Sequence, residues 1–194
     1  MSTDRPAWPV CELTGADRPA LERHFLALGT EDRRLRFGVP LREEALCAYV
    51  RCIDFNRDAV FGVVDDGLRL VGVVHLASLD EQAEVGVSVL LAHRNRGVGY
   101  VLLETAIRRA RNWGVRALYM HCLGQNKAIM HLARKQGMNV VRETGEADAR
   151  VELPSALASV LHDALAGIAA LFAYALKHNG SPVSARLNQP IRVG

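Results

Sequence analysis

A short glycine-containing turn between two regular segments is the part of this sequence best suited to binding a ligand. Residues 94–99 read Arg-Asn-Arg-Gly-Val-Gly, after an apolar alternating run (84–91) that predicts a strand and before an amphipathic stretch that ends near Trp113. The first amides of a helix lack helical partners, the helix dipole is positive there, and glycine lets an anion approach the backbone. The spacing is neither that of the nucleotide-triphosphate loop nor the dinucleotide fingerprint. A phosphate-binding turn is therefore predicted; a surface turn with solvated arginines is the alternative.

The strand that precedes this turn carries one carboxylate suited to proton transfer. Side-chain alternation places the polar and small residues on one face: Glu84, Gly86 and Ser88. The opposite face is apolar and is predicted to be core: Val85, Val87, Val89 and Leu91. Small neighbours leave room for a ligand beside Glu84. This residue is therefore a candidate general base, with an ordinary edge carboxylate as the alternative reading.

The rest of the chain alternates between strand-like and helix-like patterns. Strands are predicted over residues 8–13, 59–64, 68–79, 84–91, 116–122, 138–143 and 149–153. Helices are predicted over residues 17–28, 30–38, 41–54, 98–113 and 125–136. This order indicates an α/β fold with a mixed sheet, antiparallel early in the chain and crossed by helices later.

Two regions of the sequence resemble the GNAT family of acyltransferases. The turn at 94–99 resembles the family's pyrophosphate-binding turn, and residues 126–138, Asn-Lys-Ala-Ile-Met-His-Leu-Ala-Arg-Lys-Gln-Gly-Met, resemble its Asn-to-Gly-Phe helix. The predicted element order over residues 8–153 is also similar to that of the GNAT fold, a central mixed β-sheet flanked by helices. Residues 32–37, 41–53 and 83–89 look most like the GNAT domains of bacterial protein-lysine acetyltransferases. The resemblance implies a GNAT domain over residues 1–153.

The resemblance also implies an activity and a set of site residues. It implies an enzyme that moves an acetyl group from acetyl-CoA to a primary amine by direct attack, with Glu84 as general base, no covalent intermediate and no metal. Acetyl-CoA would contact Val87, Ser88, Val89, Arg94, Asn95, Arg96, Gly97, Val98, Gly99, Tyr100 and Asn126. The residues alone give Asn126 a second interpretation, as the N-cap of the helix that follows it.

One position departs from the family pattern. Many relatives carry a tyrosine general acid in the helix before Gly137, where this chain has Ala133. Either another group protonates the leaving thiolate, or the thiolate leaves unprotonated toward water and helix dipoles. The candidate acids by sequence proximity are Tyr100, Tyr119 and Ser88. His75 and His121 are weaker candidate bases than Glu84, and Cys122 is expected to be a buried thiol rather than a nucleophile.

The acceptor remains open at the level of sequence. Similarity to protein-lysine acetyltransferase domains favours a lysine side chain, and a small amine or polyamine is the alternative because acceptor loops vary most. A non-catalytic acyl-CoA sensor that uses the same turn is the competing class of function.

Composition and the C-terminal segment limit the remaining classes. A net charge of +3 over 194 residues gives no argument for nucleic-acid binding, and six arginines lie between positions 94 and 116 against one acid, Glu104. Four unpaired cysteines and an N-terminus without a signal-peptide core suggest a cytoplasmic protein with reduced, mostly buried thiols. Residues 154–178 are predicted to form an extra apolar helix and 179–194 a flexible tail. The middle of this predicted helix, residues 164–176, has thirteen uncharged residues, fewer than the ~20 that span a bilayer. We therefore expect the helix to be buried or to form a homodimer instead of inserting into a membrane.

Overall fold

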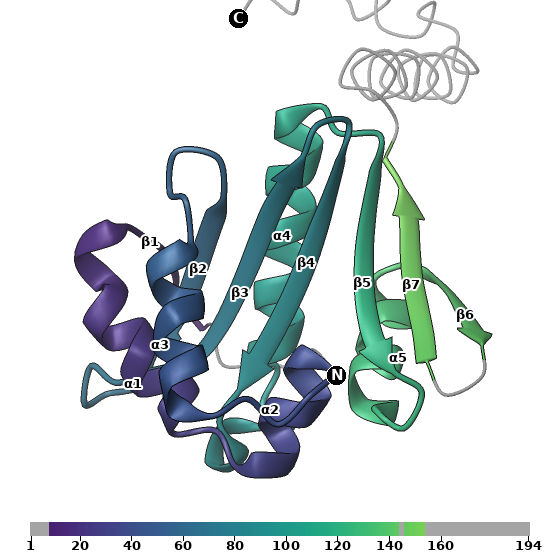
Figure 1. Cartoon of the computed structure of the whole chain (residues 1–194). Helices are drawn as coiled ribbons and strands as arrows, with labels where there is room; N and C mark the ends of the chain where they lie inside the picture. The colour runs from purple at the N-terminus through teal and green to yellow at the C-terminus, as the bar shows by residue number, and fades with distance from the viewer. Residues whose placement is uncertain (1–7, 144–145, 154–194) are drawn as a thin grey trace, which may run out of the picture. The chain divides into compact units, whose positions relative to one another are not determined.

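A seven-stranded mixed sheet forms the centre of the molecule (Figure 1). The computed structural model describes residues 8–143 and 146–153, which lie in the first of two units of the chain, residues 1–155. The strand order is β1-β2-β3-β4-β5-β7-β6, and only β4 and β5 are paired in parallel. The strands are β1 (Val10–Leu13), β2 (Ala59–Val64), β3 (Leu70–Leu79), β4 (Gln82–Val89), β5 (Ala117–Leu123), β6 (Asn139–Glu143) and β7 (Glu146–Glu152). The predicted α/β fold with a mixed sheet is confirmed.

Helices cover both faces of this sheet. They are α1 (Arg18–Leu26), α2 (Thr30–Phe37), α3 (Glu43–Cys52), α4 (Val98–Trp113) and α5 (Lys127–Lys135). Figure 1 shows α4 behind the sheet, where it packs on β2, β3 and β4, with α1 and α3 on the opposite face. Each face therefore has its own apolar cluster: Leu102, Leu118 and Ala133 belong to the α4–α5 side, and Phe25 and Leu46 to the α1–α3 side.

The sheet divides between β4 and β5. The register between them covers three pairs only, from Gln82 with Ala117 to Glu84 with Tyr119. Beyond this point β5 continues along β7, while β4 runs on beside β3, and Figure 1 shows the two strands separating. Among the described residues, the edge of β4 that faces β5 therefore lacks a strand partner after Glu84, and its backbone groups are open to a ligand.

Two sequence expectations for this domain are wrong. Leu91 was expected on the core face of a strand, but β4 ends at Val89 and Leu91 is 75% exposed in a short 3-10 turn (Leu91–His93). The cysteines were expected to be mostly buried, but only Cys122 is; Cys11 and Cys52 are exposed, and all four are unpaired. Periodicity does not locate the point at which an alternating strand turns away, which explains the first error.

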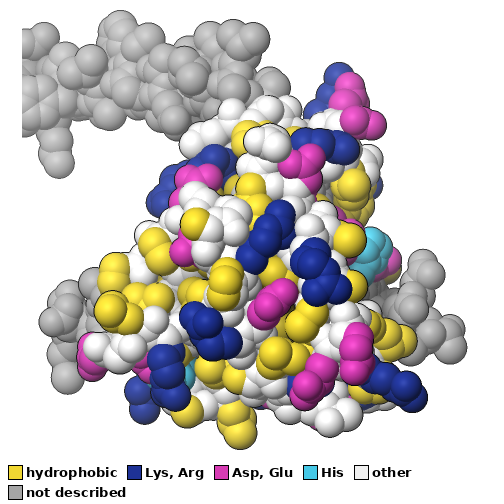
Figure 2. Space-filling view, turned by 60° about the vertical axis from the view of Figure 1, so that its left-hand side comes forward, with side chains coloured by type: hydrophobic (Ala, Val, Ile, Leu, Met, Phe, Trp, Pro, Cys, Tyr) yellow, Lys and Arg dark blue, Asp and Glu magenta, His cyan; other side chains and the backbone are white. Residues whose placement is uncertain are grey.

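The predicted helix at 154–178 and tail at 179–194 lie outside the described residues, as does the homodimer expected through that helix. Within the described ranges, no helix combines the length and apolarity required to cross a bilayer. On the face shown in Figure 2, basic and acidic side chains are interspersed with apolar ones and do not form one basic patch.

Candidate functional site

Two adjacent cavities lie where β4 and β5 separate. The larger cavity, about 960 Å³, is lined by the end of β4, the turn at 94–99 and one side of α5 along its length. The smaller cavity, about 420 Å³, is lined by the middle of β4, the end of β5 and parts of α2 and α3. Leu35 and Arg36 of α2 line both cavities, so the two spaces meet at this helix.

The turn before α4 has the geometry expected of an anion site. Gly97 is the N-cap residue and has a φ of +87°, in the left-handed region that favours glycine. The first bond into the helix runs from the Val101 amide to the Gly97 carbonyl, at 3.1 Å. The Val98 and Gly99 amides precede it and have no partner among the described residues. Two unpaired amides and the positive end of a four-turn helix therefore face the larger cavity.

Every predicted cofactor residue except Val98 lines this cavity. The Val98 side chain is 1% exposed and packs in the core beside Gly72, so only its backbone is available to a ligand. Packing alone also favours glycine at position 99, because an added Cβ would lie 3.3 Å from Leu132 of α5. The absence of a side chain at Gly99 therefore lets α4 and α5 pack closely, in addition to any role toward a phosphate.

The arginines of the turn are not simply solvated. Arg94 pairs with Asp32 at 2.7 Å, and its Nε donates to the Val89 carbonyl at 3.0 Å. The indole of Trp8 donates to the Arg96 carbonyl at 2.8 Å, which attaches the N-terminal segment to the turn. The later arginines of the 94–116 cluster lie at the other end of α4: Arg109 pairs with Glu12. A sixteen-residue helix is ~24 Å long, so these later arginines do not surround the turn.

The two faces of β4 differ from the sequence expectation. Ser88 was expected to leave open space, but it is 7% exposed and its hydroxyl donates to His24 Nε2 at 2.8 Å. His24 Nδ1 in turn donates to the Leu70 carbonyl at 2.9 Å, which in the neutral ring leaves Nε2 to accept from the serine hydroxyl. Burial lowers the pKa of His24 to about 4. Because this hydroxyl already serves a buried histidine, Ser88 is a poor candidate for a general acid.

Gly86 is covered as well. An added Cβ at this position would lie 2.1 Å from the guanidinium carbon of Arg36, so the arginine occupies the space that the sequence suggested was open. The alternation of β4 was thus predicted correctly, but its polar face is packed against α1 and α2. On that face Gln82 and Glu84 are exposed, and of these two Glu84 lines the smaller cavity.

Glu84 has no hydrogen bond or ion pair to any described residue. Its position is fixed by the sheet, because its Cα is in register with Ala77 of β3 and Tyr119 of β5. An exposed carboxylate without a partner is free to accept a proton, which is the property required of a general base.

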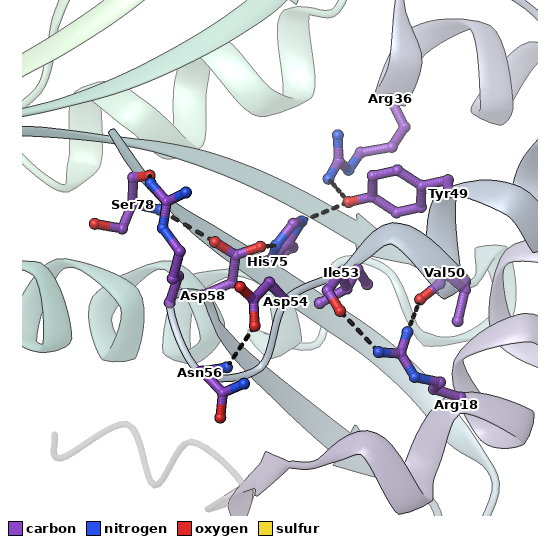
Figure 3. Close-up of polar contacts among 11 residues, drawn as sticks. Arg18, Arg36, Tyr49, Val50, Ile53, Asp54, Asn56, Asp58, His75 and Ser78 are labelled. Atoms are coloured by element: carbon purple, nitrogen blue, oxygen red, sulfur yellow. Dashed lines mark hydrogen bonds and ion pairs between the residues drawn. The ribbon is translucent and has the colours of Figure 1, made fainter. Parts of the chain in front are cut away.

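Four side chains are joined by hydrogen bonds beside the smaller cavity, and three of them, Arg36, Tyr49 and His75, line it (Figure 3). His75 Nε2 donates to Asp58 at 3.0 Å, which leaves Nδ1 to accept from the Tyr49 hydroxyl at 2.6 Å. The same hydroxyl accepts from Arg36 Nη2 at 3.2 Å. Burial lowers the pKa of His75, against the raising effect of Asp58, and burial raises the pKa of Tyr49. Since both ring nitrogens of His75 are in use, His75 is not an available base.

The opposite wall carries a second histidine. His121 Nδ1 donates to Asp148 at 2.6 Å, and both side chains are largely exposed. Cys122 donates to the Ala147 carbonyl at 3.0 Å, and burial, followed by the Asp148 charge, raises its pKa. A thiol with a raised pKa is a weak nucleophile, in agreement with the structural role expected for Cys122.

Of the remaining residues singled out from the sequence, Asn126 and Tyr100 line the larger cavity, whereas Tyr119 and Ala133 line neither cavity. The N-cap interpretation of Asn126 is confirmed, since its side chain accepts from the Ile129 amide at 3.2 Å, and Asn126 also lines the larger cavity. Ala133 is completely buried, and Tyr119 lines neither cavity but lies under the Arg150 guanidinium. Tyr100 does line the larger cavity.

The residues that sequence reasoning missed are those that contact β3 and β4 from α1, α2, α3 and the loop before β2. His24, Arg36, Tyr49 and Asp58 are 17 to 64 positions away from the residues that they contact in β3 and β4. No local pattern predicts such pairs. Asp148 was likewise missed, because only the β5–β7 register places it beside His121.

The chain is similar to known acetyltransferases in both sequence and structure. "Putative phosphinothricin acetyltransferase YwnH" of Bacillus subtilis (strain 168) is 40% identical over 58 residues, which are 30% of this chain and 36% of that protein. The GNAT domain of S. lividans PAT superposes with a TM-score of 0.64 at 23% identity, covering 74% of this chain and 89% of that one. A GNAT superfamily phosphinothricin acetyltransferase from Sinorhizobium meliloti, in complex with AcCoA, gives 0.62 at 16% identity, covering 75% and 88%.

These likenesses agree with the sheet that divides at β4 and β5 and with the glycine turn before α4. The sequence model of the Acetyltransferase (GNAT) family matches residues 19–138, which include α1 to α5 and the lining of both cavities except at their margins. The chain therefore belongs to the GNAT family of acetyltransferases.

Proposed function

We propose that this protein transfers an acetyl group from acetyl-CoA to a primary amine, with the cofactor in the larger cavity and the acceptor in the smaller one. The observation that carries the proposal is that the two cavities meet at Arg36, so that a thioester in one and an amine in the other would be neighbours. The glycine turn lies in the first cavity and the unpaired carboxylate of Glu84 in the second.

The larger cavity suits a phosphate-bearing, extended ligand. Its turn offers the Val98 and Gly99 amides to a pyrophosphate, with Arg96 and Lys135 on the lining to compensate the charge. The free edge of β4 offers backbone groups to the amides of an extended arm, as an added strand would use them. Arg94, held by Asp32 and the Val89 carbonyl, would keep the turn in place.

Glu84 would receive a proton from the acceptor ammonium, directly or through one water. An alkylamine must lose this proton before its lone pair can attack the thioester carbon. Because Ala133 supplies no hydroxyl, we propose that the thiolate leaves unprotonated, stabilised by water and by the positive end of α5, and that the nitrogen gives up its second proton to water as the amide forms.

Three acceptor classes and one non-catalytic function compete. A protein lysine, a polyamine and a small amine such as phosphinothricin, which the names of two similar proteins suggest, all present a primary amine. A sensor would bind acetyl-CoA without turnover. The test is release of free thiol from acetyl-CoA on mixing the full chain with a panel of amines: an enzyme releases thiol above background with some acceptor, and a sensor binds acetyl-CoA but releases none.

A further inference from the structure

Arg36 carries a positive charge that no described carboxylate neutralises. None of the ion pairs in the described part of the chain includes this residue, although its neighbours Arg34 and Arg94 both pair with acids. Its Nε is buried and has no hydrogen-bond partner there, and its one hydrogen bond goes to the neutral Tyr49 hydroxyl. A partly buried guanidinium without an anion is costly, which suggests that the anion arrives with a ligand.

The position of this guanidinium is fixed by its surroundings rather than by an acid. Its planar group lies 4.8 Å from the centre of the Phe37 ring and 6.0 Å from that of Tyr49. Tyr49 is held in turn by His75, and His75 by Asp58, as Figure 3 shows. These contacts hold Arg36 in place, and its one hydrogen bond, from Nη2 to Tyr49, leaves other N–H groups on the two Nη atoms without a partner among the described residues.

Arg36 of α2 and Glu84 of β4 both line the smaller cavity, over the same face of β4. The guanidinium covers Gly86, two residues from Glu84, and two residues of a strand span ~7 Å. The smaller cavity therefore has a carboxylate and an unpaired guanidinium on its lining, over strand positions that are two residues apart. A molecule with an amine and a carboxylate a few atoms apart can contact both groups at once, since each hydrogen bond adds ~3 Å.

We propose that the acceptor is a small amino acid, whose carboxylate binds Arg36 while its amine lies between Glu84 and the thioester. The inference rests on the proposed acetyltransferase function and specifies its substrate class. Arginine is suited to this role because its planar donors match a carboxylate in pairs, and such charge-assisted bonds are the stronger ones. A polyamine would bring further positive charge toward Arg36, and a lysine within a protein chain has an amide where the carboxylate is needed.

The test compares each amino acid with its primary amide, which lacks the carboxylate charge, and adds one acceptor from each competing class. Thiol release from acetyl-CoA is measured with the full chain for α-, β- and γ-amino acids, for the primary amide of each, for a lysine-containing peptide and for spermidine. We expect kcat/KM for the accepted amino acid to exceed that for its amide by about tenfold to a hundredfold, the range that charged hydrogen bonds give. The difference should lie mainly in KM.

Variants at two positions locate the preference. Arg36→Gln should lower kcat/KM for the acid much more than for the amide and so remove the preference, while Arg36→Lys should retain part of the preference. Gly86→Ala should also reduce the preference, because the added Cβ occupies the space of the guanidinium. Arg34→Gln is the matched control: it lies on the same helix, pairs with Glu31 and lines neither cavity, so its preference should equal that of the parent.

The outcomes separate this inference from the function on which it rests. Acetylation of the peptide or spermidine in preference to every amino acid would overturn the inference and leave the acetyltransferase function standing. An equal loss with acid and amide in Arg36→Gln would also overturn it, since Arg36 would then act on the cofactor or on the transition state. Acetyl-CoA binding without thiol release from any member of the panel would overturn both.

Discussion

Replacing Glu84 by glutamine tests the proposed base with little structural interference. The side chain is exposed and makes no hydrogen bond or ion pair to a described residue, so the substitution removes a charge without breaking a contact. We therefore expect unchanged folding stability and unchanged acetyl-CoA affinity. The effect should appear in turnover alone.

The size of the loss follows from the proton that the base removes. A lysine-type amine with a pKa of ~10.4 has about one free molecule in a thousand near pH 7.4, so an enzyme without a base loses up to ~10³ in rate. General-base assistance is typically worth ~10² to 10⁴, in agreement with this figure. The rate of Glu84→Gln should also rise about tenfold per pH unit until the amine itself deprotonates, whereas the parent should change less steeply.

The assay is thiol release at saturating acetyl-CoA over a series of pH values, with Glu81→Gln as control. Glu81 is an exposed carboxylate three positions away that pairs with Arg116 and lines neither cavity. Parental turnover in Glu84→Gln, with the same pH profile as the parent, would refute the reasoning. The His121–Asp148 pair across the same cavity would then be the base to test.

Three further predictions concern the turn, a buried histidine and the thiols. Gly97→Val should weaken acetyl-CoA binding in calorimetry, whereas Gly114→Val, which imposes the same left-handed strain at the other end of α4, should not; equal weakening would contradict the anion site. The pKa of His24 is lowered to about 4, so the unfolded chain takes up a proton first as pH falls below ~6.5, and the free energy of unfolding should fall by about 3 kcal/mol between pH ~6.5 and 4. In denaturant unfolding, the His24→Gln variant should not show this loss of stability at low pH. If the variant loses as much stability as the parent, groups other than His24 cause the loss. In alkylation followed by mass spectrometry, exposed Cys11 should react well before Cys122, whose pKa is raised by burial; equal rates would be inconsistent with that burial.

Local patterns predicted the parts of the site that depend on neighbouring residues. The turn at 94–99 was predictable because glycine spacing, a preceding strand and a following amphipathic helix are all local features. The exposure of Glu84 followed from the period of two along β4. The N-cap role of Asn126 followed from its place before a helical pattern.

The errors arise where packing between distant segments decides. Alternation placed Gly86 and Ser88 on a polar face, but it did not show that Arg36 covers one and His24 bonds the other from 64 positions away. The prediction for Leu91 was wrong for a related reason. The strand ends at Val89, whose carbonyl accepts from Arg94, and Leu91 begins a 3-10 turn. Such pairings depend on how α1 and α2 dock on the sheet, which periodicity does not encode.

The short pairing between β4 and β5 also has a consequence for the motions of the domain. Three registered pairs are the only ladder between the β1–β4 half and the β5–β7–β6 half in the described ranges, and side-chain packing beneath α4 and α5 supplies the rest of the connection. Backbone ladders resist local opening more than side-chain contacts do, so amide hydrogens at the free edge of β4 should exchange with solvent faster than those between β2 and β3. A ligand that contacts both this edge and α5 would link the two halves of the sheet and slow the exchange of these amide hydrogens. Ligand binding in the larger cavity should therefore be detectable as slower hydrogen exchange in β4.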